Sequence, residues 1–373
     1  MEVRLKDYEW FLPFQVSICM RPTLIVYDNI FLEHKPWFPH PENPNRLKIA
    51  LKGLEEHGIL NNRYVSIVKP SKGDLDLVYK VHVKGYVDYV LRLSRKAPAE
   101  IDPDTYVSEG TLEAALYAIG ALIRIHNEYL DKGVSTGIAL VRPPGHHAGK
   151  AGKALGAPTQ GFCIFNNIAI LAKYLLDKWY RRIAIIDIDV HHGNGTQEIF
   201  WTEPRVLHID FHQDPLTLYP GTGFPEDIGE GEGEGTKVNI VLPMNSGDDL
   251  YLDALELAIA ILEQFKPQVI LFSAGFDAYV DDGLADMRIT SNAFYEIPNR
   301  IIRELKPSLT IASLEGGYSR GLSRGLPAFV AAMIGIDNPV IDEPTRTLRS
   351  TTRSRFHEYM RTLRRVLREY WDI

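Results

Sequence analysis

Short apolar runs alternate with segments of helical periodicity along most of the chain. The runs consist mainly of Ile, Val and Leu with few polar interruptions, which is typical of strands buried on both faces; they span residues 23–28, 137–144, 182–190, 205–211, 237–243, 268–275 and 309–317. Apolar residues at helical spacing occupy 43–58, 110–133, 166–180, 249–265 and 291–305. This alternation predicts an α/β fold with a mostly parallel sheet covered by helices on both faces.

The chain shows no internal repeat and no long linker, which favours a single domain. We expect an N-terminal extension at 1–20, the domain at 21–340 and a basic helix at 341–373. The tail surrounds its apolar positions with eight arginines: Arg346, Arg349, Arg353, Arg355, Arg361, Arg364, Arg365 and Arg368. Packing of the apolar stripe of this helix on the domain is favoured over docking on RNA, on a membrane or on an acidic partner.

Composition narrows the class of protein. The chain of 373 residues is 45% hydrophobic and 24% charged, as is usual for a soluble enzyme. No apolar run is long enough to cross a bilayer, and the N-terminus carries acidic and aromatic residues instead of a signal-peptide core, so we expect a cytoplasmic protein. The net charge of −7 argues against nucleic-acid binding by the main body. Cys19 and Cys163 are too few for a disulfide framework.

Polar residues gather at the carboxyl ends of four predicted strands. They are His146 and His147 after 137–144, Asp189 and His191 around the end of 182–190, Asp277 after 268–275, and Glu315 to Tyr318 around the end of 309–317. In an open parallel sheet, ligands bind at this edge. Four separate strands that deliver polar groups to one edge therefore predict a single site.

Three of these residues have the character of metal ligands. Side chains alternate along a strand, so Asp187, Asp189 and His191 are expected to point the same way. Asp189 and His191 can chelate a divalent cation, and Asp277, from the strand across the switch point, would be the third ligand. Three protein ligands with one open position suit catalytic zinc, and Fe²⁺, Co²⁺ and Mn²⁺ also accept two carboxylates and an imidazole. Singly, each residue is more often a cap or core group; together they predict a metal site.

Seven motifs occur in the order that one known family shows. They are "HPENPNRL" (40–47), "RPPGHHA" (142–148), "GFCIFNN" (161–167), "DIDVHHGNGTQEIF" (187–200), "YPGTG" (219–223), "SAGFDA" (273–278) and "LEGGY" (314–318). Over residues 23–335 the chain resembles the histone deacetylase superfamily, in particular its class II and bacterial or archaeal branch with the acetylpolyamine amidohydrolases. The resemblance implies the arginase/deacetylase fold, a central sheet of about eight strands sandwiched by helices, with a narrow gorge that leads to one zinc held by Asp189, His191 and Asp277.

The resemblance also implies a chemistry. A metal with an open position polarises an amide carbonyl and lowers the pKa of bound water towards ~7. His147, oriented by Asn194, is expected to act as general base and then as general acid. His146 would be an electrostatic partner oriented by Asp187. Tyr318 would donate its hydroxyl to the developing oxyanion.

Further residues are expected to surround the substrate. They are Phe162 and Tyr219 as gorge walls, Gly145 and Gly161, which leave room for the acyl chain, Gly316 in the tyrosine loop, Arg46 behind the metal where acetate leaves, and Asp102 or Asp104 at the rim. For Arg46, a surface salt bridge is an equally good interpretation. Relatives also hold a monovalent cation, K⁺ or Na⁺, so one is expected near the backbone of Asp187, Asp189 and His191, where Asp210 and Phe211 arrive.

The predicted function is hydrolysis of acyl amides, with removal of acetyl groups from acetyl-lysine, acetylated polyamines or small amines as the favoured reaction. Two alternatives remain. A dinuclear manganese ureohydrolase would need a second Asp-x-Asp pair after "SAGF", and here Asp277 stands alone in that register. A non-catalytic acyl-lysine-binding relative would be expected to lack Tyr318 or one of the paired histidines. The physiological substrate, the native metal and the oligomeric state, a homo-oligomer included, stay open.

Overall fold

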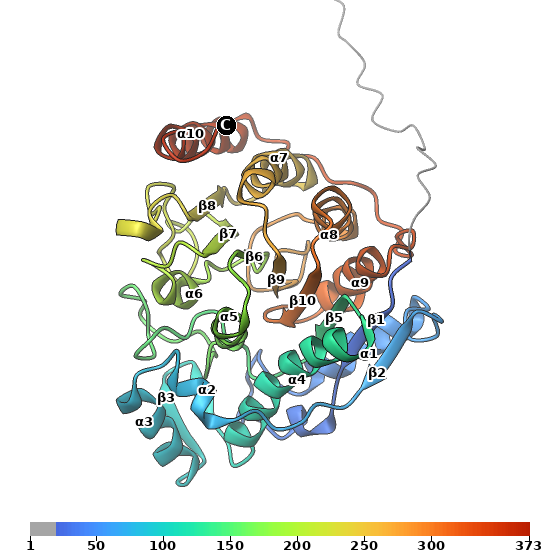
Figure 1. The fold of residues 1–373 in the computed structure, drawn as a ribbon. Helices are drawn as coiled ribbons and strands as arrows, with labels where there is room; N and C mark the ends of the chain where they lie inside the picture. The colour runs from blue at the N-terminus through green and yellow to red at the C-terminus, as the bar shows by residue number, and fades with distance from the viewer. Residues whose placement is uncertain (1–19) are drawn as a thin grey trace, which may run out of the picture.

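A sheet of eight parallel strands forms the centre of the molecule (Figure 1). The computed structural model describes residues 20–373, so the extension predicted at 1–20 lies outside the described residues apart from Met20. In their order across the sheet, the strands are β2 (Val65–Val68), β1 (Thr23–Val26), β5 (Thr136–Ala139), β10 (Leu309–Leu314), β9 (Val269–Ala274), β6 (Ile183–Asp187), β7 (Val206–Gln213) and β8 (Lys237–Leu242). The prediction of a single α/β domain with about eight mostly parallel strands is confirmed.

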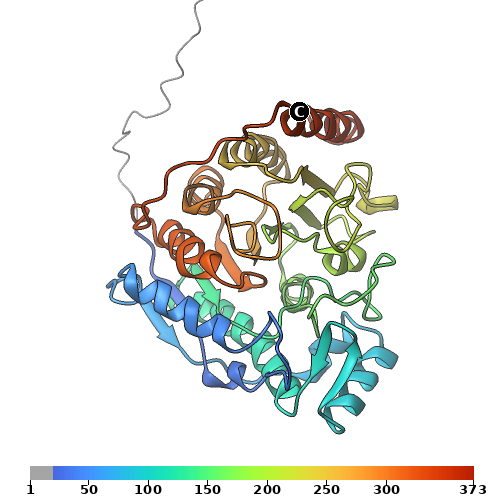
Figure 2. The same cartoon turned by 180° about the vertical axis from the view of Figure 1, so that it is seen from behind.

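Helices cover both faces of this sheet (Figures 1 and 2). One face packs against α4 (Thr111–Lys132) and α5 (Asn167–Lys178); the other carries α1 (Asn45–Glu56), α7 (Asp248–Phe265), α8 (Ser291–Leu305) and α9 (Leu326–Ile334). Local signals fix their ends: Asn166 and Thr290 accept backbone N–H bonds at the starts of α5 and α8, and Gly133 ends α4 with a φ of +70°. Because both faces are covered, every residue of seven strands is buried, and most of these strands are predominantly apolar in sequence.

Shorter elements fill the connections between the main ones. They are η1 (Asn29–Leu32), α2 (Leu75–Tyr79), α3 (Lys84–Ser94), β3 (Ala99–Asp102), β4 (Thr105–Val107), α6 (Asn194–Ile199), η2 (Gly231–Gly233) and η3 (Gly321–Gly325). Strands β3 and β4 pair antiparallel and form a separate hairpin. The sequence pattern did not predict this hairpin, the edge strand β2, or helices α2, α3, α6 and α9.

The C-terminal helix α10 (Ser350–Leu367) lies against β8 and α7. Its apolar residues Phe356, Met360, Leu363 and Leu367 are buried, while most of its arginines are exposed. Within residues 20–373, no helix combines the length and the apolar character that a membrane span requires.

The topology brings the predicted site residues together. Strands β5, β10, β9 and β6 are consecutive neighbours in the sheet and run in the same direction. Their carboxyl ends therefore meet at one edge, and the loops that follow them carry the two histidines, the tyrosine and the three predicted ligands.

Candidate functional site

The predicted ligand residues after β6 lie in a turn, not in a strand. Strand β6 ends at Asp187, three residues earlier than the apolar run predicts. The Asp187 carboxylate accepts the Asp189 N–H at 3.1 Å, and the Asp189 carboxylate accepts the His191 N–H at 3.0 Å. These two local bonds replace the strand alternation that the sequence suggested, and they fix the direction of each carboxylate.

Asp189, His191 and Asp277 bring their ligand atoms within 4.8 Å of one another. The His191 Nδ1 lies 3.0 Å from Asp189 Oδ1 and 3.2 Å from Asp277 Oδ2. Backbone donors hold the carboxylates from behind: Gly316 N–H donates to Asp189 at 2.7 Å, and Val190 N–H donates to Asp277 at 2.9 Å. All three side chains are buried or nearly so, and Asp277 Oδ2 is a buried oxygen without a hydrogen-bond donor among the described residues.

The charges of this cluster fit a divalent cation. Burial raises the pKa of Asp277, and the neighbouring Asp189 carboxylate raises it further. Burial lowers the pKa of His191, but its contacts with Asp189 and Asp277 outweigh burial and raise the value to about 9. Two carboxylates and one imidazole directed at one point need positive charge between them, which a cation with nitrogen and oxygen ligands supplies.

The two histidines after β5 have different partners. His146 Nδ1 donates to the Asp187 carboxylate at 3.0 Å, and His147 Nδ1 donates to the Asn194 side-chain oxygen at 2.8 Å. The Asn194 amide nitrogen donates to the Ala154 carbonyl at 2.9 Å, which fixes the orientation of that amide. His147 therefore carries its proton on Nδ1 and keeps Nε2 as an acceptor.

The electrostatic environment separates these two histidines. Burial opposes a charge on His146, but the carboxylates of Asp187 and Asp189 outweigh it and hold the pKa of His146 well above its usual range. Burial lowers the pKa of His147 well below its usual range, and positive charge on His146 and His191 lowers it further. His147 is consequently the neutral imidazole of the pair, as a general base must be.

The loop after β10 carries Tyr318 and is held by Asp282. The Asp282 carboxylate, 4% exposed, accepts backbone N–H bonds from Tyr318 at 2.6 Å, Ser319 at 2.9 Å and Gly321 at 2.8 Å. Within residues 20–373, the Tyr318 hydroxyl makes no hydrogen bond, so it is available to a ligand. Sequence reasoning missed Asp282, although it lies only five residues after Asp277.

The two predicted gorge residues lie beside different site residues: Tyr219 beside His147 and His191, and Phe162 beside Tyr318. The Tyr219 ring packs edge-on against His147 at 5.0 Å and against His191 at 6.1 Å between centroids. The Phe162 ring lies edge-on to Tyr318 at 6.2 Å, and Phe162 has a left-handed φ of +68°. A Cβ at Gly161 would approach His147 Cδ2 to 2.5 Å, so this glycine lets the backbone pass close to the imidazole.

Other predicted residues have roles that the sequence did not suggest. A Cβ at Gly145 would lie 2.6 Å from the Phe165 carbonyl oxygen, so Gly145 is required by backbone packing. A Cβ at Gly316 would lie 2.2 Å from Asp277 Oδ2, which places this glycine directly on the ligand cluster. Asp102 accepts the Gln160 N–H at 2.8 Å, and Asp104 accepts from the Thr159 hydroxyl, so both hold the loop that leads to Phe162.

Arg46 is buried beneath the tyrosine loop, which excludes the surface salt bridge. Its Nε donates to the Gly317 carbonyl at 2.7 Å, and its guanidinium lies over the Tyr318 ring at 4.8 Å. Its Nη1 donates to Glu42 at 3.2 Å. The guanidinium therefore links the "HPENPNRL" segment to the loop that carries Tyr318.

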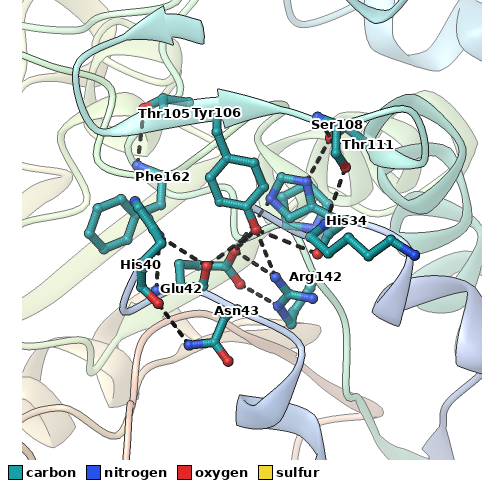
Figure 3. Close-up of polar contacts among 12 residues, drawn as sticks. His34, His40, Glu42, Asn43, Thr105, Tyr106, Ser108, Thr111, Arg142 and Phe162 are labelled. Carbon is teal, nitrogen blue, oxygen red and sulfur yellow. Dashed lines mark hydrogen bonds and ion pairs between the residues drawn. The ribbon is translucent and has the colours of Figure 1, made fainter. Parts of the chain in front are cut away.

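Glu42 is the centre of a buried network that sequence reasoning missed (Figure 3). Arg142 donates to both Glu42 oxygens, one at 2.8 Å, and also to the Phe31 carbonyl at 2.9 Å. The Tyr106 hydroxyl donates to Glu42 at 2.9 Å. Since Arg142 directly precedes the "PPGHH" loop, this ion pair anchors the paired histidines to the segment that carries Arg46. The sequence did offer a signal for this network: Glu42 and Arg142 are charged residues within two of the motifs, "HPENPNRL" and "RPPGHHA".

A second cluster lies behind the ligand turn. Asp187, His208 and Asp210 bring possible ligand atoms within 4.8 Å of one another. Gly193 N–H donates to Asp210 at 2.8 Å, and His212 Nδ1 donates to the same carboxylate at 2.7 Å. Asp187 and Asp210, two residues named for the predicted monovalent cation site, are thus neighbours, and burial together with Asp210 raises the pKa of Asp187.

Comparisons with known proteins identify the family of this chain. The profile of the histone deacetylase domain matches residues 40–333. A probable deacetylase of Archaeoglobus fulgidus is 38% identical over 364 residues, which cover 94% of this chain and 98% of that protein. An uncharacterized protein of Methanocaldococcus jannaschii is 40% identical over 350 residues, with the same coverage of 94% and 98%. The crystal structure of the HDA15 HD domain is similar with a TM-score of 0.81 and 30% identity, over 94% of this chain and 96% of that chain. The chain belongs to the histone deacetylase family.

Proposed function

We propose that the protein is a metal-dependent deacetylase that hydrolyses acetyl amides carried on slim chains, such as acetyl-lysine, acetylated polyamines or small acetylated amines. The observation that carries this proposal is the convergence of Asp189, His191 and Asp277 beside a neutral imidazole and an unbonded tyrosine hydroxyl. Membership of the family, and the printed name of the A. fulgidus relative, support the reaction class.

Asp189, His191 and Asp277 would hold the divalent cation, with zinc favoured and Fe²⁺, Co²⁺ or Mn²⁺ as alternatives. When bound there, such an ion supplies a Lewis acid that polarises an amide carbonyl and makes water nucleophilic near neutral pH. K⁺ or Na⁺ near Asp187 and Asp210 would offset the negative charge of two facing carboxylates.

His147 is assigned the role of general base and general acid. Its Nδ1 proton is engaged by Asn194, so Nε2 can take a proton from water and return it to the amine leaving group. His146 would stay protonated and support the site electrostatically, held by Asp187. The two imidazoles would thus have different roles because their partners differ: Asp187 is a carboxylate, whereas Asn194 is a neutral amide.

Tyr318 is assigned to the oxyanion. A free hydroxyl on a loop held by Asp282 is suited to donate to charge that develops on the carbonyl oxygen, a contribution typically worth about 10² to 10³ in rate. Phe162 and Tyr219 would flank the substrate chain, Gly161 and Gly316 would let it approach the metal, and Gly145 would support the loop from behind. Arg46, under the Tyr318 ring, would meet the acetate product.

The two alternatives make different demands. A dinuclear centre needs further carboxylates around the same point, and among the described residues the cluster contains only Asp189 and Asp277 beside His191. A non-catalytic module has no need of a neutral, oriented His147 or of a tyrosine hydroxyl without a partner.

The test compares a fluorogenic acetyl-lysine peptide with acetylated polyamines after the protein is loaded with Zn²⁺ or Co²⁺. We expect turnover of at least one substrate, and its loss in His147→Ala with the metal content unchanged. Turnover of none of these substrates, with one metal ion bound, would favour the binding module.

A further inference from the structure

The C-terminal segment differs sharply in charge from the rest of the chain. Residues 346–373 contain eight arginines and three acidic residues, a net charge of +5, whereas the whole chain carries −7. The preceding 345 residues therefore carry −12. The segment contains no lysine, and the last lysine of the chain is Lys306. A basic segment on an otherwise acidic protein is typical of a contact surface for a polyanion.

Four of these arginines form a single stripe along α10 and its C-cap residue, Arg368. Arg361, Arg364, Arg365 and Arg368 occupy positions i, i+3, i+4 and i+7, which share one face of a helix. All four are exposed. Within residues 20–373, none of them lies within ion-pair distance of a carboxylate. We call these four residues the arginine stripe.

Other arginines of the same helix behave differently. Arg353 donates to Asp249 at 2.6 Å, and Arg355 donates to Asp214 at 2.8 Å. These two pairs help to fasten the N-terminal half of α10 to the domain. The arginine stripe in the C-terminal half makes no such attachment, so its charge is available to a partner.

The residues on the solvent-exposed face of α10 indicate which kind of partner it would bind. The apolar residues of α10 are buried against the domain, and none of its large apolar side chains is exposed. A helix that enters a membrane interface needs an exposed apolar face beside its basic face. Glu358 is the only acidic residue of α10, Glu369 directly follows Arg368, and Asp253 of α7 lines the same hollow as Arg361 and Arg364. In the part of the chain that the structure describes, none of these three carboxylates lies within ion-pair distance of a stripe arginine.

We propose that the arginine stripe binds the phosphate backbone of double-stranded nucleic acid without sequence specificity. Guanidinium groups bind phosphate through two parallel hydrogen bonds and are less strongly hydrated than ammonium groups, which gives a physical reason for arginine at every basic position of this helix. The N-terminal half of α10 contacts the loop after β7 through Asp214, but its C-terminal end lies beside the start of β8, where Trp371 Nε1 donates to the Gly235 carbonyl at 2.7 Å. The proposed deacetylase site lies at the other end of the strands, so nucleic acid bound to the arginine stripe would leave it open.

Fluorescence anisotropy with a labelled 24-base-pair DNA duplex tests the proposal on the full chain. Four phosphate contacts predict a slope of about −3.6 in a plot of log K against log salt, which is a loss of about 150-fold in affinity between 50 and 200 mM salt. Replacement of all four stripe arginines by glutamine should abolish binding. The double variant Arg361→Gln, Arg365→Gln should halve the slope.

The matched control removes the same charge elsewhere through Lys52→Gln, Lys69→Gln, Lys84→Gln and Lys96→Gln, all at exposed positions. This control should bind the duplex like the unmodified chain, and both quadruple variants should keep their activity on a small acetylated substrate. No binding at 50 mM salt would overturn the proposal. So would an equal loss in the lysine control, or binding to vesicles of anionic lipid with no binding to the duplex.

Discussion

Asp282→Asn tests whether a buried carboxylate outside the predicted metal-ligand set controls the position of Tyr318. One Asp282 oxygen accepts the Tyr318 N–H, and the other accepts the N–H groups of Ser319 and Gly321. Asparagine preserves the shape but offers only one acceptor oxygen. The variant must therefore leave either the Tyr318 N–H or the other two N–H groups facing an amide NH₂.

A buried donor left without an acceptor costs about 1–3 kcal/mol. If about 2 kcal/mol of that cost opposes the aligned loop, kcat falls by about 30-fold, since about 1.4 kcal/mol corresponds to a factor of ten. The ceiling is the full loss of the tyrosine hydroxyl, about 10² to 10³ in rate. KM should change little, because the phenol acts on developing charge more than on the bound substrate.

The control is Asp281→Asn at the adjacent position, where the carboxylate is 75% exposed and lies 3.6 Å from Arg320. Its kcat should stay within about twofold of the unmodified protein, as exposed ion pairs contribute little. In the Tyr318→Phe background, Asp282→Asn should have almost no further effect on kcat, because the group that it positions is gone. An additive loss in the double variant would refute the positioning role and leave only a structural one.

Three further predictions concern charge. Asn194→Asp should move the acidic limb of the pH–rate profile to higher pH, because a carboxylate stabilises protonated His147 and raises its pKa; an unchanged limb in kcat/KM against pH would count against the assigned base. Glu42→Ala should lower the free energy of unfolding, measured by urea titration, by about 3–5 kcal/mol, because it leaves two buried guanidinium groups uncompensated. The control Glu33→Ala, which removes the exposed ion pair with Lys35, should lower it by less than about 1 kcal/mol. Buried His82 donates to a carbonyl and accepts an N–H, and burial lowers its pKa from 6.5 to about 4. As the pH decreases from about 6.5 to about 4, the unfolded chain therefore binds a proton at His82 before the folded chain does, and the stability of the fold decreases. His82→Gln should flatten the dependence of Tm on pH over that range.

The strands that the sequence predicted are those buried on both faces, because only these produce long apolar runs. Strand β2 was missed since it lies at the sheet edge with its middle residues, Ser66 and Ile67, exposed. Helix α9 was missed for the opposite reason. All of its nine residues are buried, so the apolar pattern has no helical period. The tail helix, amphipathic and basic, was visible because only one of its faces is covered.

The convergence of Asp189, His191 and Asp277 could be predicted because the neighbouring strands β6 and β9 deliver them to one sheet edge. The detailed geometry could not, because β6 ends at Asp187 and a turn, held by its own carboxylates, aims Asp189 and His191. The supporting residues were missed for a related reason. Glu42 pairs with Arg142, 100 residues away, and Asp282 accepts backbone N–H groups 36 to 39 residues away. No local sequence pattern marks such contacts.

Metal stoichiometry tests the central claim most directly. After removal of metal with a chelator and reloading with Zn²⁺, elemental analysis of the full chain should find one ion per chain, the same in His147→Ala and Tyr318→Phe, and none in Asp277→Ala. Full occupancy in Asp277→Ala, or two ions per unmodified chain, would contradict a single centre formed by Asp189, His191 and Asp277.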